Sequence, residues 1–277
     1  MKIFKPNTTF IAIAGMAVSS LFLSCDAEEQ ITETQNLKND SSVLQESQSQ
    51  AISGQYIVTL NEAASKSIKN DDSYKGRLAN VNAFVNEMIA APHMKSTSVK
   101  QVYGFAMTGF TATLSPEQLK SLQSDSRVAS VEPDVMVKLS VAKEETTAMA
   151  FVAQNTPYGI TRVNGGVDGT GKTAWIIDSG IDLDHPDLNV DVDRSKSFVP
   201  GEPSPDDQNG HGSHVAGTVA AIDNGIGVIG VASNAKVVAL KVLGADGSGA
   251  TSGIIAALDY VAAVGEPGDA ANMSLGP

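Results

Sequence analysis

The stretch Lys172–Asp182, KTAWIIDSGID, decides the fold. Its first seven residues form a short apolar run that contains Trp175 and two isoleucines, which is typical of a buried strand rather than a helix. The run ends at Asp178, and Ser179-Gly180 follows as a turn signal. We therefore expect a buried strand that presents a carboxylate at its carboxyl end.

Similar elements continue downstream of this strand. Lys236–Leu243 is a second apolar strand, and Ala271–Leu275 begins a third. His211–Ile222 and Ser252–Val264 lie between them and are predicted to be helices. Alternating strands and helices predict an α/β fold with a doubly wound parallel sheet that is covered on both faces. Ligands bind beyond the carboxyl ends of such strands, which makes Asp178 and the helix-starting His211 candidate site residues.

A second, smaller domain is predicted upstream, over residues 55–139. Its pattern is β-α-β-β-α-β, the order of a ferredoxin-like α+β fold. The segments are Gln55–Leu60, Tyr74–Ala91, Val99–Tyr103, Ala106–Leu114, a helix that starts at Ser115-Pro116, and a short strand Val128–Val131 that ends before Pro133. Ser115 and Gln118 have the spacing of a capping box at that helix start.

The N-terminus has the features of an export signal over residues 1–25. Lys2 and Lys5 precede the apolar run Phe10–Leu23, which is too short to span a bilayer. Leu21–Cys25, LFLSC, resembles a bacterial lipoprotein cleavage box, which implies lipidation of Cys25; simple secretion with an unmodified thiol is the alternative. Residues 26–54 are polar and are expected to form a disordered tether.

Composition excludes several classes of function. The 277 residues include 31 acidic and 19 basic side chains, a net charge of -12 that argues against binding nucleic acid or anionic lipid through the overall field. The single cysteine excludes a disulfide framework and a zinc site built on paired cysteines. Any membrane association is therefore expected to depend on a lipid at Cys25.

Four sequence blocks, in this order, resemble the subtilisin-like serine proteases (peptidase S8). Trp175–Asp182, WIIDSGID, and Asn209–Thr218, NGHGSHVAGT, resemble the family's aspartate and histidine blocks. Gly244–Gly249, GADGSG, and Asn272–Gly276, NMSLG, are similar to its substrate-binding segments. Upstream, GFTA at residues 109–112 and VEPD at residues 131–134 resemble the family's inhibitory I9-type propeptide. Ser252–Ala256, SGIIA, is closer to the proteinase K and aqualysin branch.

The resemblance implies an Asp-His-Ser triad for peptide bond hydrolysis. A hydroxyl needs a base to remove its proton as it attacks, and a carboxylate fixes the imidazole that serves as that base. His211 would be the general base and acid, and Asp178 its orienting partner. The nucleophilic serine is expected beyond Pro277, so the polypeptide as written is expected to be inactive. Ser179 and Ser213 belong to the two motifs, and Thr251 and Ser252 suit the cap of the helix that follows.

The resemblance also implies how polypeptide substrates bind. A substrate would add as a strand to backbone exposed by small residues, with plain turn glycines as the alternative. The chain's own propeptide would act as an intramolecular inhibitor. The substrate-binding residues implied are Gly247, Ser248, Gly249, Ser274, Leu275 and Gly276.

A structural calcium ion is the one cofactor that the resemblance implies. Calcium takes six to eight oxygen ligands in flexible geometry. The ligands implied are the side chains of Gln154, Asp187 and Asn224 and the carbonyl oxygens of Ile222, Ile226 and Val228. A solvated turn at residues 222–228 is the alternative.

These interpretations predict an exported, cell-envelope lipoprotein precursor. Residues 140–153 would be a processing linker, residues 154–277 the N-terminal part of the peptidase domain, and the mature domain would be extracellular. Two rival interpretations remain open at this stage. One is a metal-dependent hydrolase that uses His185, His211 and His214, although no H-E-x-x-H motif is present. The other is a non-catalytic homologue, or a propeptide that acts only as an inhibitor or folding aid.

Overall fold

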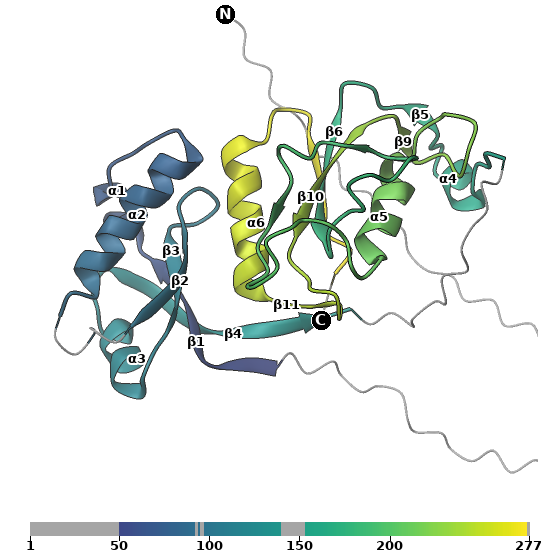
Figure 1. Cartoon of the computed structure of the whole chain (residues 1–277). Helices are drawn as coiled ribbons and strands as arrows, with labels where there is room; N and C mark the ends of the chain where they lie inside the picture. The colour runs from purple at the N-terminus through teal and green to yellow at the C-terminus, as the bar shows by residue number, and fades with distance from the viewer. Residues whose placement is uncertain (1–49, 92–93, 95–96, 140–152, 276–277) are drawn as a thin grey trace, which may run out of the picture. The chain divides into compact units, whose positions relative to one another are not determined.

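The computed structural model describes residues 50–91, 94, 97–139 and 153–275 (Figure 1). The export signal with Cys25, most of the predicted tether, nearly all of the predicted processing linker, and Gly276 lie outside the described residues.

The N-terminal module is a ferredoxin-like α+β domain. Its elements are β1 (Gln50–Leu60), α1 (Glu62–Ser67), α2 (Tyr74–Met88), β2 (Ser98–Tyr103), β3 (Gly109–Thr113), α3 (Pro116–Gln123) and β4 (Val128–Lys138). The strands pair antiparallel in the order β4-β1-β3-β2. A single apolar core, which includes Val58, Val81, Val85 and Phe110, joins the sheet to the helices. The capping box predicted for α3 is formed by Ser115 and Gln118.

Two boundaries differ from the sequence-based prediction. Residues 50–54, which we expected to belong to the tether, form the start of β1, because Gln50 and Ala51 pair with Met136 and Val135 of β4. β4 does not end before Pro133 but runs on to Lys138. A register shift in β1 between Ala51 and Tyr56 lies opposite this part of β4 and accommodates the proline, which has no N–H to donate.

The second part of the described chain is an α/β domain. Its elements are α4 (Tyr158–Arg162), β5 (Val167–Asp168), β6 (Thr173–Asp178), β7 (Asn189–Val190), β8 (Lys196–Ser197), α5 (His211–Ala220), β9 (Ala232–Ser233), β10 (Lys236–Lys241), β11 (Ser248–Ala250), α6 (Thr251–Val264) and β12 (Ala270–Asn272). The main sheet is parallel, in the order β12-β6-β10-β7, with β8 alongside the end of β10. β5 and β9 form a separate pair.

The main sheet is covered on both faces, as the continuous apolar strands predict. Ile176 of β6 packs with Val215 and Ala216 of α5 in one core. Its neighbours Trp175 and Ile177 face the opposite side, where the core includes residues of α6. The fold is therefore the doubly wound α/β arrangement, and it directs the carboxyl ends of β6 and β10 to the same edge.

Within the part of the chain that the structure describes, no helix combines the length and the hydropathy needed to cross a membrane.

Candidate active site

Asp178 and His211 meet at the carboxyl edge of the main sheet. Asp178 is the last residue of β6 and is fully buried, while His211 is the first residue of α5. Nδ1 of His211 lies 2.8 Å from Oδ1 of Asp178. At this distance a proton on Nδ1 is donated to the carboxylate, which leaves Nε2 as the nitrogen that can exchange a proton with a reacting group.

Two glycines bring the helix to this place. Gly210 precedes α5 with a φ of 99°, a left-handed conformation that glycine adopts without strain. A Cβ on Gly212 would collide with the carbonyl oxygen of Gly180 in the turn that follows β6. The flanking glycines of the Gly-His-Gly string therefore let the first turn of α5 pack directly against the Asp178 turn.

The Asp178 carboxylate is held in an unfavourable environment for a charge. Burial raises its pKa above the usual range, and the hydrogen bonds from His211 and from the backbone nitrogen of Ser179, the latter at 2.7 Å, only partly oppose this. The negative charge of Asp207 raises the pKa further. Oδ2 is buried and has no hydrogen-bond partner among the described residues. The buried carboxylate therefore has His211 Nδ1, at 2.8 Å, and the nitrogen of Ser179 as its hydrogen-bond partners.

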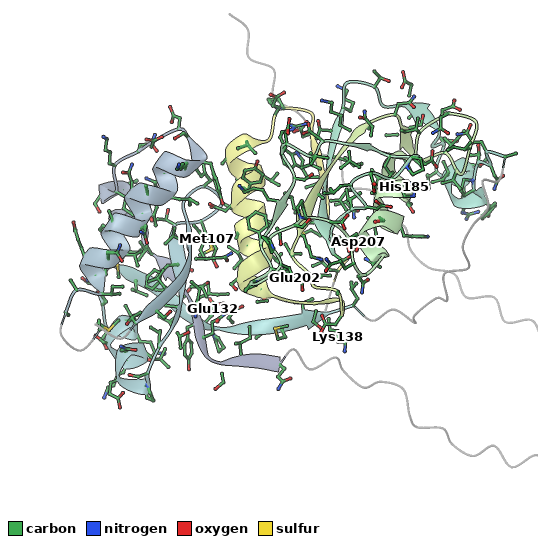
Figure 2. All side chains as sticks on the ribbon, in the orientation of Figure 1. Met107, Glu132, Lys138, His185, Glu202 and Asp207 are labelled. Carbon is green, nitrogen blue, oxygen red and sulfur yellow. The ribbon has the colours of Figure 1, made fainter. Side chains whose placement is uncertain are left out.

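Asp207 is a site residue that the sequence analysis missed. Burial alone would raise its pKa, but hydrogen bonds from Gly210, Ser213 and Asn209 more than offset that effect and hold the pKa below the usual range. It lies in the loop before α5, in the string Asp207-Gln208-Asn209-Gly210 (Figure 2). An aspartate shortly before a helix start is a known turn and capping signal, so the string itself could have indicated it.

The two serines next to the pair have structural roles. The hydroxyl of Ser179 donates to Asp207 Oδ1 at 2.9 Å and accepts from the backbone nitrogen of Gly212 at 2.9 Å. The hydroxyl of Ser213 donates to Asp207 Oδ2 at 2.7 Å and accepts from the nitrogen of Asp182. Both hydroxyls are thus engaged in holding the loops together, in agreement with their assignment to the motifs rather than to the nucleophile.

The predicted substrate strand is occupied by the N-terminal module. β11, which contains Ser248 and Gly249, pairs antiparallel with residues 136–138 of β4. The backbone nitrogen of Leu139 also donates to the carbonyl oxygen of Gly247 at 3.0 Å. The tail of the N-terminal module is therefore bound as an added strand along the predicted Gly247–Gly249 segment.

The other predicted substrate-binding segment has different surroundings. Ser274 accepts a hydrogen bond from the side chain of Asn272 at 2.9 Å. Leu275 packs against the core on the α6 side of the sheet. Within the described part of the chain, neither makes a hydrogen bond to the bound tail, and Gly276 lies outside that part.

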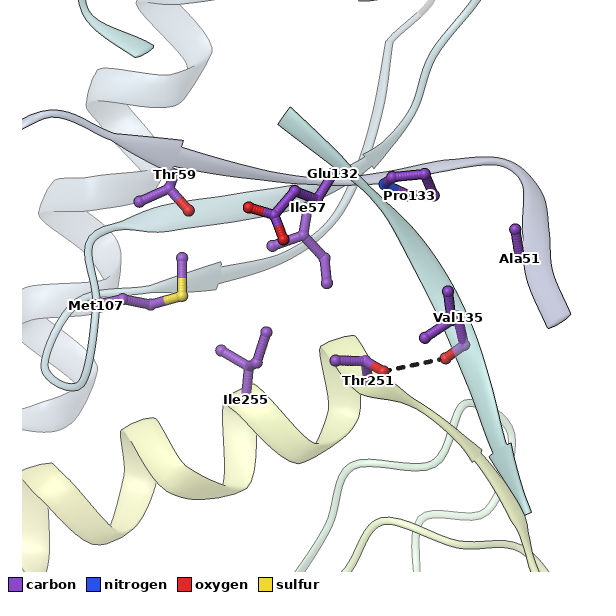
Figure 3. Close-up of a pocket in the computed structure, with 9 residues that line it drawn as sticks. All are labelled: Ala51, Ile57, Thr59, Met107, Glu132, Pro133, Val135, Thr251 and Ile255. Carbon is purple, nitrogen blue, oxygen red and sulfur yellow. Dashed lines mark hydrogen bonds between the residues drawn. The ribbon is translucent and has the colours of Figure 1, made fainter. Parts of the chain in front are cut away.

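Thr251 and Ser252 do not supply the helix cap that we expected. The N-cap of α6 is Ala250, whose side chain makes no capping bond. Instead, Asp134 of β4 accepts a hydrogen bond from the backbone nitrogen of Ser252 at 3.0 Å, and Thr251 donates its hydroxyl proton to the carbonyl oxygen of Val135 at 3.2 Å (Figure 3). The cap is provided by the N-terminal module.

A cavity lies beside this contact, between α6 and the sheet of the N-terminal module (Figure 3). Most of its lining is apolar. The lining residues are Ala51, Ile57, Thr59, Met107, Glu132, Pro133, Val135, Thr251 and Ile255. It contains neither Asp178 nor His211, so it is separate from the candidate active site.

The residues proposed for calcium gather around the loop 222–228. Asp187 is buried, and its two oxygens accept hydrogen bonds from the Asn224 side chain at 3.1 Å and from the nitrogen of Val228 at 3.2 Å. Gln154 reaches the same loop, since its side-chain nitrogen donates to the Ile222 carbonyl at 2.8 Å. A carboxylate, two amides and loop carbonyls form an oxygen-rich set, which is the chemistry that calcium prefers.

The histidines of the rival metal interpretation do not form a cluster. Nδ1 of His185 accepts a hydrogen bond from the nitrogen of Asp187 at 3.2 Å, as in a local turn. His214 lies one turn after His211 on α5 and is exposed. Across residues 50–91, 94, 97–139 and 153–275, no group of three or more His, Cys, Asp or Glu side chains is arranged to hold a metal ion.

Comparisons with known proteins agree with this geometry. Residues 169–277 match the family model described as the subtilase family, and residues 55–140 match the model described as peptidase inhibitor I9. The chain is 46% identical over 169 residues to an alkaline protease of Alkalihalobacillus alcalophilus, an alignment that covers 59% of this chain and 40% of that protein. It is 43% identical over 172 residues to subtilisin E of Bacillus subtilis (strain 168), covering 60% of this chain and 41% of that protein.

A third relative, subtilisin BL of Lederbergia lenta, is 51% identical over 130 residues, which are 45% of this chain and 46% of that protein. The chain thus spans less than half the length of these curated relatives. The two matched regions coincide with the two folded parts that carry the bound tail and the Asp178–His211 pair. The chain therefore has one region similar to peptidase inhibitor I9 domains, over residues 55–140, and one region similar to the subtilase family, over residues 169–277.

Proposed function

We propose that this chain is the precursor of a secreted, subtilisin-like serine endopeptidase. The observation that carries the proposal is the 2.8 Å contact between His211 Nδ1 and Asp178 Oδ1, next to a strand edge that already binds an extended polypeptide. Since Nδ1 is committed to the carboxylate, Nε2 takes the proton of a serine hydroxyl as that oxygen attacks the peptide carbonyl carbon. Nε2 then returns the proton to the leaving amine, and water hydrolyses the acyl-enzyme. The serine belongs to the family's later Gly-Thr-Ser block.

The enzyme expressed from its complete gene tests this proposal. We expect hydrolysis of casein and covalent labelling by a fluorophosphonate probe. Asp178→Asn should lower kcat by about 10,000-fold, and His211→Ala should lower it by about 1,000,000-fold. His214→Ala is the matched control, because it removes an exposed imidazole from the same helix and should leave kcat within about two-fold. Activity that is lost with a chelator such as 1,10-phenanthroline but resists the fluorophosphonate would instead support the metal-dependent alternative.

The N-terminal module (residues 50–139), called the I9 domain below for its similarity to peptidase inhibitor I9, acts in this proposal as an intramolecular inhibitor of the same enzyme. Its tail lies antiparallel to β11, where a substrate strand would bind. Asp259 of α6 adds a second attachment, because its buried carboxylate accepts hydrogen bonds from the nitrogens of Gly104, Phe105 and Ala106 at 2.7 to 3.1 Å. Polypeptide substrates compete for the β11 edge only after this domain has been removed.

A structural calcium ion is held by the loop 222–228. Gln154, Asp187 and Asn224 supply side-chain oxygens, and Ile222, Ile226 and Val228 supply carbonyl oxygens. Rotation of the Gln154 and Asn224 amide groups by about 180° exchanges the positions of their oxygen and nitrogen atoms. Both oxygens can then face the ion, so the present hydrogen bonds do not exclude this ligand set. When bound, the ion joins three segments of a domain that has no disulfide and stabilises the folded state by mass action.

The chain is exported, and Cys25 carries a lipid. Processing between Leu139 and Gln154 leaves Cys25 on the I9 side, so the catalytic part is released into the medium. Labelling of the precursor with an alkyne-tagged palmitate, abolished by Cys25→Ser, is expected. A mature domain that stays in the membrane fraction after processing would count against this arrangement. The SGIIA string at residues 252–256 supports placement in the proteinase K and aqualysin branch.

A further inference from the structure

We propose that Asp207 is a positioning residue that fixes the Asp178 turn and the first turn of α5 relative to each other. The inference rests on the proposed function, because the pair that it positions is the proposed catalytic pair. Asp207 itself makes no hydrogen bond to either Asp178 or His211. It acts through their neighbours in sequence.

The Asp207 carboxylate is the centre of a hydrogen-bond network, called the circuit below, that joins Ser179, Gly212 and Ser213 in a ring. Oδ1 accepts from the hydroxyl of Ser179, the residue after Asp178, at 2.9 Å. Oδ2 accepts from both the nitrogen and the hydroxyl of Ser213, two residues after His211, at 2.9 and 2.7 Å. The circuit closes because the Ser179 hydroxyl accepts from the nitrogen of Gly212 at 2.9 Å. One carboxylate thus joins the neighbours of both members of the pair.

These bonds go beyond what a helix cap requires. A capping side chain satisfies free N–H groups at the start of a helix, and Asp207 does this for the nitrogen of Ser213 at 2.9 Å. It also accepts hydrogen bonds from the nitrogens of Asn209 and Gly210, just before the helix, at 3.0 and 2.9 Å. The bond to Ser179 serves no helix N–H group. It connects the loop before α5 to the turn after β6, which is 28 residues earlier in the sequence.

The need for two accepting oxygens explains why the residue is a carboxylate. Among the described residues, every hydrogen-bond partner of the Asp207 carboxylate is a donor, with three bonds to Oδ1 and two to Oδ2. An asparagine has a single accepting oxygen. Its amide nitrogen can only donate, so in place of one carboxylate oxygen it would meet other donors without forming a hydrogen bond. Asp207→Asn must therefore break either the Ser179 side or the Ser213 side of the circuit, with almost no change in volume.

Kinetics of the enzyme expressed from its complete gene provide the test. We expect Asp207→Asn to lower kcat by about 10- to 100-fold, because a small displacement of a reacting group is enough for that loss, while KM stays within about two-fold. The matched control is Asp206→Asn, which removes the same charge one residue earlier; its carboxylate accepts only a long 3.4 Å bond from the nitrogen of Leu183. The control should keep kcat within about two-fold.

A spectroscopic readout separates positioning from folding. The Nδ1 proton of His211, bonded to Asp178, should give a low-field proton NMR signal that shifts or broadens in Asp207→Asn and is unchanged in Asp206→Asn. If Asp207→Asn does not fold, Ser179→Ala breaks the same link and should lower kcat in the same direction. Wild-type kcat and an unshifted signal in a folded Asp207→Asn or Ser179→Ala variant would overturn the inference. Absence of peptidase activity in the wild-type enzyme would overturn the proposed function instead.

Discussion

The carboxylate of Asp134 and the backbone nitrogen of Ser252 lie 3.0 Å apart, so the N-terminal module caps helix α6 of the α/β domain. Asp134 is fully buried, and its other oxygen accepts a hydrogen bond from Gln55 at 2.6 Å. α6 receives no side-chain cap from its own domain, and a negative charge at its N-terminus is also favourable for the helix dipole. Folding of the two domains is therefore coupled at this end of α6.

Asp134→Ala should weaken the attachment of the I9 domain. Loss of an N-cap costs about 1 kcal/mol, which corresponds to a rise of about five-fold in the dissociation constant of the processed I9 domain from the peptidase domain. Titration calorimetry or inhibition of peptidase activity measures this constant. Asp72→Ala, which removes an exposed carboxylate elsewhere in the I9 domain, is the control. A dissociation constant equal to that of the wild type would show that the cap does not contribute to binding.

Asp259→Ala should have a larger effect on the same equilibrium. Within the described residues, its carboxylate is the only hydrogen-bond acceptor for the backbone nitrogens of Gly104, Phe105 and Ala106. Leaving these N–H groups without a partner costs about 2 kcal/mol, or about 30-fold in the dissociation constant. Glu266→Ala removes an exposed carboxylate just after the same helix and should change the constant by less than two-fold. If the two variants bind the I9 domain equally well, Asp259 is not an attachment point.

The structural features that could be predicted from the sequence are those that depend on a short run of contiguous residues. The run of buried residues in β6 and the glycines around His211 each sit in one short string, so the α/β fold and the Asp178–His211 pair could be identified before any coordinates. Asp134 and Asp259 could not be identified in this way, because each acts on backbone or side-chain groups between 79 and 155 residues away that carry no signature of their own. For Asp207 the string indicates a cap for α5, but not the bond to Ser179, which lies 28 residues earlier.

The limits of β1 and β4 have a similar explanation. Residues 50–54 are polar enough to resemble the tether, and Pro133 is a usual strand end. Their strand conformation depends on pairing with each other and, for the tail of β4, with β11 of the other domain. Strand pairing over such distances is decided by the whole fold rather than by local preference.

Removal of calcium should destabilise the mature enzyme. At a free calcium concentration 100 times the dissociation constant, binding contributes about 2.7 kcal/mol, so excess EDTA should lower the melting temperature by about 5 to 10 °C. Asp187→Asn should lose most of this response, because it removes the one carboxylate of the proposed site. Asp184→Asn, which neutralises an exposed carboxylate nearby, should keep it. A wild-type melting temperature that does not respond to EDTA would rule out the calcium site.

Asp178→Asn should abolish peptidase activity and yet stabilise the fold at neutral pH. The folded-state pKa of Asp178 is raised by burial, so the folded protein holds a proton more tightly than the unfolded chain does. Tighter proton binding by the folded state contributes to the free energy of unfolding. That contribution is fully present below the ordinary carboxyl pKa of 3.8 and is lost as the pH rises through the higher folded-state pKa. At pH 7 the wild type therefore bears the full cost of a buried charge, which the amide avoids.

Urea unfolding of the wild type and of Asp178→Asn, measured between pH 3 and pH 7, checks the sign. The free energy of unfolding of the variant minus that of the wild type should increase with pH above about 3.8 and then level off. Asp207→Asn should show the opposite dependence, because the pKa of Asp207 is lowered and its contribution to stability is lost as the pH falls through that value. A difference for Asp178→Asn that shrinks as the pH rises would mean that hydrogen bonds to the carboxylate, rather than its burial, dominate its energetics.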